Sequence, residues 1–345
     1  MNRAVPESAA RRCAQELARG RVAVVPGSAR ATCAANIALV KYWGKRDETL
    51  NLPVAPSLSV STGTWGSTAE IAVLPDAAGD KISLNGKQLP AESPFAVRLS
   101  RFLDLFRPDA RFRFSVETAN AMPTAAGFAS SASGFAAVVV ALDGLFGWGL
   151  RARELSILAR LGSGSASRSI EPGFVEWRAG KRSDGMDSFG VRLDAEWPGF
   201  RLGAVVVSGA EKPMGSRAAM RHCKATSPFY GAWPPTVEKD LRTVRRAICA
   251  RDMELLGATA EANALAMHAL MLASRPSVFY PLPETLAAIR RVQELRAGGV
   301  PVWFTMDAGP NPKLLFEAGT ERKLRTVFPK LEVLAPFDDL SQARA

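Results

Sequence analysis

Small residues and hydroxyl groups gather in the stretch Pro123-Thr-Ala-Ala-Gly-Phe-Ala-Ser-Ser-Ala-Ser-Gly134, directly before an apolar run with helical spacing. Small side chains let backbone N–H groups approach a phosphate closely. The first turn of a helix adds unpaired N–H groups and a partial positive charge. The stretch lacks the Gly-Lys-Ser/Thr ending of a Walker loop. Taken alone, it fits an anion site and a Ser-rich helix cap equally well. Its phosphate-binding candidates are Pro123, Ala126, Gly127, Ala129, Ser130, Ser131 and Ser133.

A second stretch, Asn36-Ile-Ala-Leu-Val-Lys-Tyr-Trp-Gly-Lys-Arg46, combines cations with aromatic residues. Side chains alternate in an extended segment, so Lys41 and Lys45 would point the same way and form a phosphate-binding face. The alternative is a solvated charged turn after a strand. The adjacent Tyr42, Trp43 and Gly44 make a plain turn the weaker interpretation.

A third stretch, Gly162-Ser-Gly-Ser-Ala-Ser-Arg-Ser169, is rich in hydroxyl groups. Hydroxyls and backbone amides suit phosphate, and the guanidinium of Arg168 suits a bidentate carboxylate. A flexible surface linker is the alternative, but the stretch lies between two apolar segments. The candidates here are Ser163, Gly164, Ser165, Ala166, Ser167 and Arg168.

The fourth stretch is Thr305-Met-Asp307-Ala-Gly-Pro-Asn311, at the end of an expected strand. A lone Asp followed by Gly-Pro usually forms a turn. That interpretation holds for Asp307 unless the fold brings its carboxylate to the cationic stretches.

The elements that must position these stretches alternate between strands and helices. Hydrophobic periodicity predicts strands at 111–116, 202–207 and 300–306, and helices at 135–146, 151–162, 235–275 and 283–297. The order predicts an α+β chain with a boundary near 195–202.

Composition and charge narrow the function further. The 345 residues are 47% hydrophobic, and the net charge of +11 is spread along the chain, which favours anionic ligands. The interleaved aromatics of a base-stacking surface are missing, so nucleic-acid binding ranks low. No apolar run approaches the ~20 residues that a membrane span needs. We therefore expect neither a nucleic acid nor a membrane as a partner.

The cysteines and histidines indicate the cellular compartment, and their spacing does not indicate a metal site. The 4 Cys and 2 His are scattered, so no zinc site is expected, and free thiols fit a reducing cytoplasm. Residues 1–30 hold six Arg and two Glu without an apolar core, so we interpret them as a surface extension rather than a signal sequence.

Together the four stretches resemble the diphosphomevalonate decarboxylases of the GHMP kinase superfamily, from about residue 31 to about residue 315. N-I-A-x-x-K-Y-W-G-K-R-D, P-T-A-A-G-x-A-S-S-A, G-S-G-S-A-x-R-S and D-A-G-P-N occur in the family's order, with smaller echoes such as Asn263-Ala-Leu-Ala-Met-His268. The resemblance implies a GHMP kinase fold: an N-terminal domain of ribosomal protein S5 domain 2 type over 31–200, and a ferredoxin-like α+β domain over 201–345. It also implies a homodimer, which we expect in the cytoplasm on the evidence of the thiols.

The resemblance implies a reaction and residue roles. Family members convert (R)-5-diphosphomevalonate to isopentenyl diphosphate with ATP and a divalent metal, here Mg²⁺. The stretch from Pro123 would hold the ATP phosphates, and Arg168 would hold the substrate carboxylate. Asp307 would lie beside the 3-hydroxyl group, with Lys41 near it. The substrate diphosphate would be bound by Tyr42, Lys45, Ser163, Ser165, Ser216 and Arg217.

Several positions depart from the family pattern. Met306 stands where Phe is common, Ser167 replaces a common Cys, and an Arg often found after Leu84-Asn85-Gly86 has no clear counterpart, although Arg98 lies nearby. Relatives that decarboxylate mevalonate 5-phosphate, or that only phosphorylate the 3-hydroxyl, remain alternatives. The 3-kinases lose the Lys or the Asp of the catalytic pair, so the presence of both favours decarboxylation.

Overall fold

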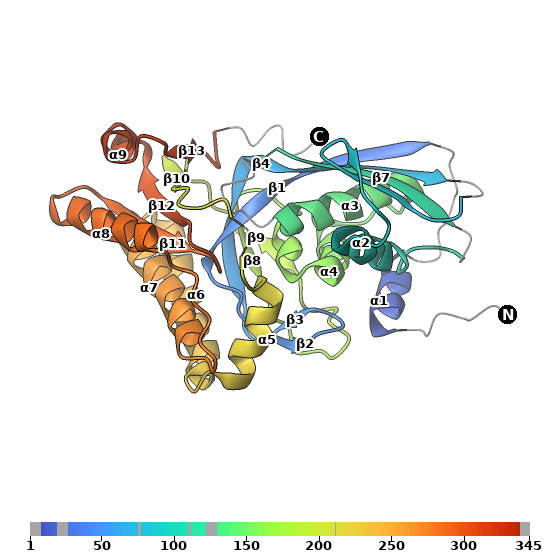
Figure 1. The fold of residues 1–345 in the computed structure, drawn as a ribbon, viewed down its shortest axis with the longest axis horizontal. Helices are drawn as coiled ribbons and strands as arrows, with labels where there is room; N and C mark the ends of the chain where they lie inside the picture. Colours follow the sequence, from blue (N-terminus) through green and yellow to red (C-terminus); the bar gives the residue numbers. More distant parts are fainter. Residues whose placement is uncertain are drawn as a thin grey trace.

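A computed structural model describes residues 8–18, 27–74, 77–109, 112–121, 130–210 and 212–338. Two β-sheets lie side by side, each covered by its own helices (Figure 1). We call them the N-terminal lobe, up to Arg192, and the C-terminal lobe, from Phe200.

The N-terminal lobe is built on a 7-stranded sheet with the order β6-β5-β7-β4-β8-β9 and with β1 paired to β4. Its pairs are antiparallel except β5 with β7. Its strands are β1 (Ser28–Val40), β4 (Ser57–Leu74), β5 (Lys81–Leu84), β6 (Lys87–Gln88), β7 (Arg113–Asn120), β8 (Phe174–Trp177) and β9 (Gly190–Arg192); β2 (Lys45–Asp47) and β3 (Leu52–Pro53) form a separate small sheet.

Helices cover one face of this sheet (Figure 1). They are α1 (Ala9–Ala18), α2 (Pro94–Leu103), α3 (Ser130–Phe146) and α4 (Ala152–Gly162), followed by the 3-10 helix η2 (Gly164–Arg168). The helix α3 is apolar nearly all round, because it lies between the sheet and its neighbouring helices. A Cβ atom at Gly162 would overlap the ring of Phe135, so the end of α4 approaches α3 as only glycine allows.

The C-terminal lobe is an antiparallel 4-stranded sheet with the order β11-β12-β10-β13. Its strands are β10 (Phe200–Ala204), β11 (Val302–Met306), β12 (Pro312–Glu317) and β13 (Glu332–Leu334). Its helices are α5 (Ser216–Thr226), α6 (Trp233–Ala250), α7 (Met253–Leu272), α8 (Pro283–Ala297) and α9 (Glu321–Val327), with the 3-10 turns η3 (Tyr230–Ala232) and η4 (Ala318–Thr320).

The helical stretch predicted over 235–275 is two helices. Arg251 adopts a left-handed conformation with φ of 51°, which ends α6, and Asp252 caps α7 by accepting a hydrogen bond from the Leu255 N–H group. By length and composition alone α7 could cross a membrane, which corrects the expectation that no apolar run is long enough. In this fold α7 packs against α6 and β11 as a core helix.

One hydrophobic core joins the two lobes. It contains Val40 of β1, Phe174 of β8, Phe200 of β10 and Leu256 of α7, each at most 1% exposed. The boundary expected near residue 200 falls between β9 and β10, and it stays a prediction because the core is continuous across it.

Candidate active site

A cavity of about 160 Å³ lies between the two lobes and collects residues from all four predicted stretches. It is lined by Asn36, Ala38, Lys41, Tyr42, Trp43, Lys45, Asn51, Ser131, Ala132, Ser163, Gly164, Ser165, Arg168, Ser216, Arg217, Met220, Met267, Asp307 and Ala308. The fold therefore brings the end of β1, the start of α3, the turn η2 and the start of α5 to the loop after β11.

An ion pair joins the lobes at this cavity. The Lys41 ammonium group is buried and donates to Oδ1 of Asp307 and to the Ala38 carbonyl, both at 2.8 Å. Burial lowers the pKa of Lys41, although the charge of Asp307 opposes this. Burial also works to raise the pKa of Asp307, but the charges of Lys41 and Lys313 outweigh it and hold that pKa well below its usual range. Asp307 is thus an ionised partner of Lys41 rather than only a turn residue.

The helix α7 holds the backbone of both members of this pair. The Lys41 N–H group donates to Oδ1 of Asn263 at 2.8 Å, and Nε2 of His268 is 3.0 Å from the Asp307 carbonyl. Because a carbonyl only accepts, His268 carries its proton on Nε2. Burial lowers the pKa of His268 to about 4, so the ring is neutral at pH 7. The family-like segment from Asn263 to His268 thus helps to fix the positions of Lys41 and Asp307.

Arg168 is a buried cation that forms no ion pair with any described residue. Its guanidinium donates to the hydroxyls of Ser57 and Ser59 and to Oδ1 of Asn36. Burial lowers the pKa of Arg168 to about 10, which leaves it charged at neutral pH. A buried cation that faces a cavity without its own anion is suited to bind an anionic ligand.

Tyr42 presents a buried hydroxyl with no hydrogen-bond partner among the described residues. Its ring packs edge-on against Trp177 with a centroid separation of 4.7 Å, which fixes its direction. Burial raises the pKa of Tyr42, so the hydroxyl stays a neutral donor. A buried donor left unpaired costs about 1–3 kcal/mol, and a ligand acceptor would recover that cost.

Other expected residues lie at the site without lining the cavity. Ser167 donates to the Gly164 carbonyl at 2.7 Å, and Ser133 shares a 2.7 Å hydrogen bond with Ser67. Ala166 is fully buried within η2, and a Cβ atom at Gly44 would overlap the Tyr230 hydroxyl. Pro123, Ala126, Gly127 and Ala129 lie outside the described residues, as does the side chain of Ser130.

Arg98, the arginine nearest to the position of the missing family Arg, does not line the cavity. Arg98 stacks on the Phe135 ring at 4.4 Å and donates to the Gly162 carbonyl at 2.9 Å. Arg217 does line the cavity and donates to the same carbonyl at 3.1 Å. Arg98 therefore supports the end of α4 from outside, and Arg217 is the arginine at that corner of the cavity.

Three residues at or near the site were not among the predicted site residues. Lys313 lies 3.4 Å from Oδ2 of Asp307, and the charge of Asp307 also acts on the half-buried Lys212. Asn51 lines the cavity and donates to the carbonyls of Arg160 and Leu161 at the end of α4. Only strand register could have indicated Lys313, because Lys313 pairs with Thr305 of β11.

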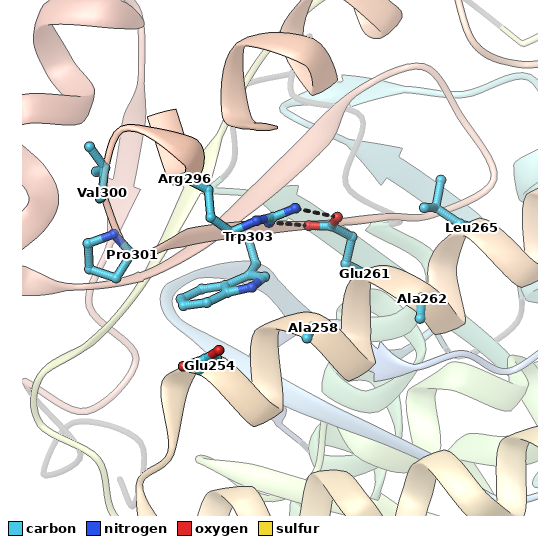
Figure 2. A pocket seen from close by; sticks show the side chains of 10 residues that line it. Glu254, Ala258, Glu261, Ala262, Leu265, Arg296, Val300, Pro301 and Trp303 are labelled. Carbon is cyan, nitrogen blue, oxygen red and sulfur yellow. Dashed lines mark hydrogen bonds and ion pairs between the residues drawn. The ribbon is translucent and has the colours of Figure 1, made fainter. Parts of the chain in front are cut away.

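Two further hollows differ from the active-site cavity in their lining. A smaller one of about 80 Å³ shares Ser131 with the cavity and is lined mainly by apolar residues: Leu84, Phe95, Leu99, Thr118, Asn120, Ser131, Gly134, Phe135 and Val138. A larger one of about 530 Å³ lies over α7 and β11, where Glu261 and Arg296 pair with each other beside Trp303 (Figure 2). Among the described residues no cluster of acidic, His or Cys side chains could hold a metal ion.

Comparison with known proteins decides the family. Residues 33–190 match the diphosphomevalonate decarboxylase-like N-terminal domain, and residues 204–341 match the mevalonate 5-diphosphate decarboxylase C-terminal domain. The chain is 34% identical to the diphosphomevalonate decarboxylase of Debaryomyces hansenii, with 87% of this chain and 82% of the relative aligned. This chain belongs to the diphosphomevalonate decarboxylase family. The resemblance inferred from the four stretches is confirmed.

Solved structures of the family agree with the fold. The mevalonate diphosphate decarboxylase of Staphylococcus aureus matches with a TM-score of 0.84 at 36% identity, covering 89% of this chain and 95% of that chain. MDDEF in complex with MVAPP, AMPPCP and magnesium matches with a TM-score of 0.83 at 39% identity, covering 90% and 97%. The predicted α+β architecture of GHMP kinase type is confirmed. As a family member the chain is a decarboxylase.

Proposed function

We propose that this enzyme converts (R)-5-diphosphomevalonate and ATP to isopentenyl diphosphate, ADP, phosphate and carbon dioxide. The observation that carries the proposal is the content of one cavity: the Lys41–Asp307 pair, the unpaired Arg168 and the unpartnered Tyr42 hydroxyl. These groups match the hydroxyl, the carboxylate and the phosphates of that substrate.

The substrate diphosphate would lie at the corner formed by η2 and the start of α5. Tyr42 offers its hydroxyl there, and Lys45 and Arg217 add positive charge. The hydroxyls of Ser163 and Ser165 are 3.4 Å apart, a separation at which both can donate to one phosphate. Ser216 opens α5, where unpaired backbone N–H groups favour an anion.

Asp307 would orient the 3-hydroxyl group and accept its proton, with Lys41 offsetting the negative charge of the transferring group. When bound, ATP supplies the phosphoryl group that turns this hydroxyl into a good leaving group. The C–O bond to phosphate then breaks, the carboxylate leaves as carbon dioxide, and its electron pair forms the new C=C bond. Arg168 would hold the carboxylate in the plane that this step requires.

ATP would bind across the first turn of α3. Ser131 lines both the active-site cavity and the smaller apolar hollow, so the phosphates can reach the reacting hydroxyl while the base lies in that hollow between Phe95 and Val138. The magnesium ion would enter on the ATP phosphates, since Mg²⁺ commonly takes ligands from substrate phosphates and water.

We place the enzyme in the cytoplasm as a homodimer. Cys13, Cys33, Cys223 and Cys249 are free thiols, as expected in a reducing compartment. An exposed stripe on α7 carries Ala258, Ala262, Leu265, Ala269 and Leu272. Glu254 and Arg275 lie at its two ends, so antiparallel packing of two copies would bring opposite charges together.

Light scattering tests the dimer. We expect twice the chain mass for the wild type and a monomer for Leu265→Arg. A monomeric wild type at assay concentration would contradict a homodimer.

A substrate panel tests the reaction. Mevalonate, its 5-phosphate and its 5-diphosphate are each incubated with ATP and Mg²⁺ and scored for carbon dioxide and ADP. We expect both products only from the diphosphate. A stable 3-phosphorylated product without carbon dioxide would select a kinase, and carbon dioxide from the 5-phosphate alone would select the shorter substrate.

A further inference from the structure

A second lysine lies behind the Asp307 carboxylate. Nζ of Lys313 is 3.4 Å from Oδ2, whereas Lys41 contacts the other oxygen, Oδ1, at 2.8 Å. Lys313 belongs to β12 and pairs directly with Thr305 of β11, the strand that leads into Asp307. The register between β11 and β12 thus holds the Lys313 ammonium group next to the Asp307 carboxylate.

Among the described residues, Lys313 is not one that lines the active-site cavity. Asp307 and Lys41 do line it. Its side chain is 3% exposed, and a buried ammonium group is costly unless it is paired. A substrate in the cavity would meet Asp307 first, so any effect of Lys313 on the reaction passes through Asp307.

The groups facing Asp307 come from every element packed against it. They are Lys41 after β1, Lys313 on β12, Lys212 in the loop before α5, Arg168 in η2, and His268 on α7, which is neutral and binds the backbone carbonyl. Burial works to raise the pKa of Asp307, and the lysines outweigh that effect. Lys313 is the only lysine among them that contacts Oδ2 in the described part of the chain.

We propose that Lys313 is a positioning residue for the reaction: its ammonium group holds Oδ2 of Asp307, keeps the carboxylate ionised and leaves Oδ1 turned toward Lys41 and the substrate hydroxyl. The inference rests on the proposed function of the site. A carboxylate that loses one of its two direct cationic contacts is protonated more easily. The acid limb of the pH–rate profile reports that protonation, which a purely structural lysine would leave unmoved.

The test compares Lys313→Met and Lys313→Gln, which remove the charge, with Lys313→Arg, which keeps it. Lys330→Met is the matched control, because Lys330 is an exposed lysine in the loop between α9 and β13. Release of labelled carbon dioxide from 5-diphosphomevalonate, ATP and Mg²⁺ is measured directly from acid to alkaline pH. Titration of the substrate phosphates is common to all proteins and cancels in the comparison.

In Lys313→Met we expect the acid limb of kcat/KM to move up by about one pH unit, with kcat about tenfold lower at pH 7 and KM within twofold of wild type. Lys313→Arg and Lys330→Met should keep the wild-type limb. If Lys313→Met does not fold, the acid limb of Lys313→Gln is measured instead. If neither variant folds while Lys313→Arg does, the role of Lys313 is structural and the proposal is overturned. An unmoved acid limb in an active, folded variant also overturns it. A wild type that releases no carbon dioxide refutes the proposed function instead.

Discussion

Two hollows of this enzyme differ in a way that their volumes do not show. The hollow over α7 and β11 has a volume of about 530 Å³, and the cavity between the lobes about 160 Å³. In the larger one, Glu261 and Arg296 bind each other at 2.9 and 3.0 Å (Figure 2). In the smaller one, Arg168 has no carboxylate partner and the Tyr42 hydroxyl has no partner among the described residues.

The comparison shows that the active site is identified by buried polar groups without a protein partner, and not by the volume of the hollow. A hollow whose charged groups already pair with each other has little to gain from an ion. The cavity between the lobes keeps a cation and a donor buried at a cost in stability, which a ligand with a carboxylate and phosphates can offset. Variants in the cavity between the lobes should therefore lower activity, whereas variants in the larger hollow should lower stability.

The largest effect is expected at the carboxylate. Asp307→Asn removes the proton acceptor and the charge that binds Lys41, so we expect kcat to fall about a thousandfold. ATP should still bind, because the start of α3 rather than Asp307 would hold its phosphates. Steady-state kinetics and nucleotide titration measure the two quantities, and a fully active variant would remove Asp307 from its role.

Arg168→Lys should cost about a hundredfold in kcat/KM. A lysine keeps the charge but cannot hold a carboxylate in a plane or keep the contacts with Ser57 and Ser59. Phosphorylation of the 3-hydroxyl should suffer less than release of carbon dioxide. Comparing ADP with carbon dioxide in a single turnover measures this, and equal losses would speak against a carboxylate clamp.

Tyr42→Phe should separate binding from stability. We expect KM for diphosphomevalonate to rise about tenfold, since one hydrogen bond to the ligand is lost. The unliganded protein should melt at the same temperature as wild type or higher, because the variant lacks the unpartnered buried hydroxyl. A lower melting temperature with unchanged KM would show that the hydroxyl serves the fold.

The smallest effect on activity is expected in the larger hollow. Glu261→Gln leaves Arg296 without its partner and should lower the free energy of unfolding by about 2 kcal/mol. We expect kcat/KM to stay within twofold of wild type. Denaturant unfolding and kinetics on one sample test this, and a loss of activity at unchanged stability would make the larger hollow functional.

Local pattern predicted much of this molecule. The helix predicted over 283–297 is α8 as observed, and the stretches holding Lys41, Arg168 and Asp307 meet in one cavity. Pattern alone missed the break at Arg251, because a single left-handed residue without Gly or Pro leaves no trace in hydrophobic periodicity. It also missed Lys313, since which residue faces Asp307 depends on the register between β11 and β12.

The shared core has a consequence for how the enzyme can move. The Lys41 ammonium group comes from one lobe and the Asp307 carboxylate from the other, and Asn263 ties α7 of the second lobe to the backbone of the first. A motion that parted the lobes would break the catalytic pair. The pair would therefore act as an interlock, because the two catalytic groups meet only while the lobes stay together.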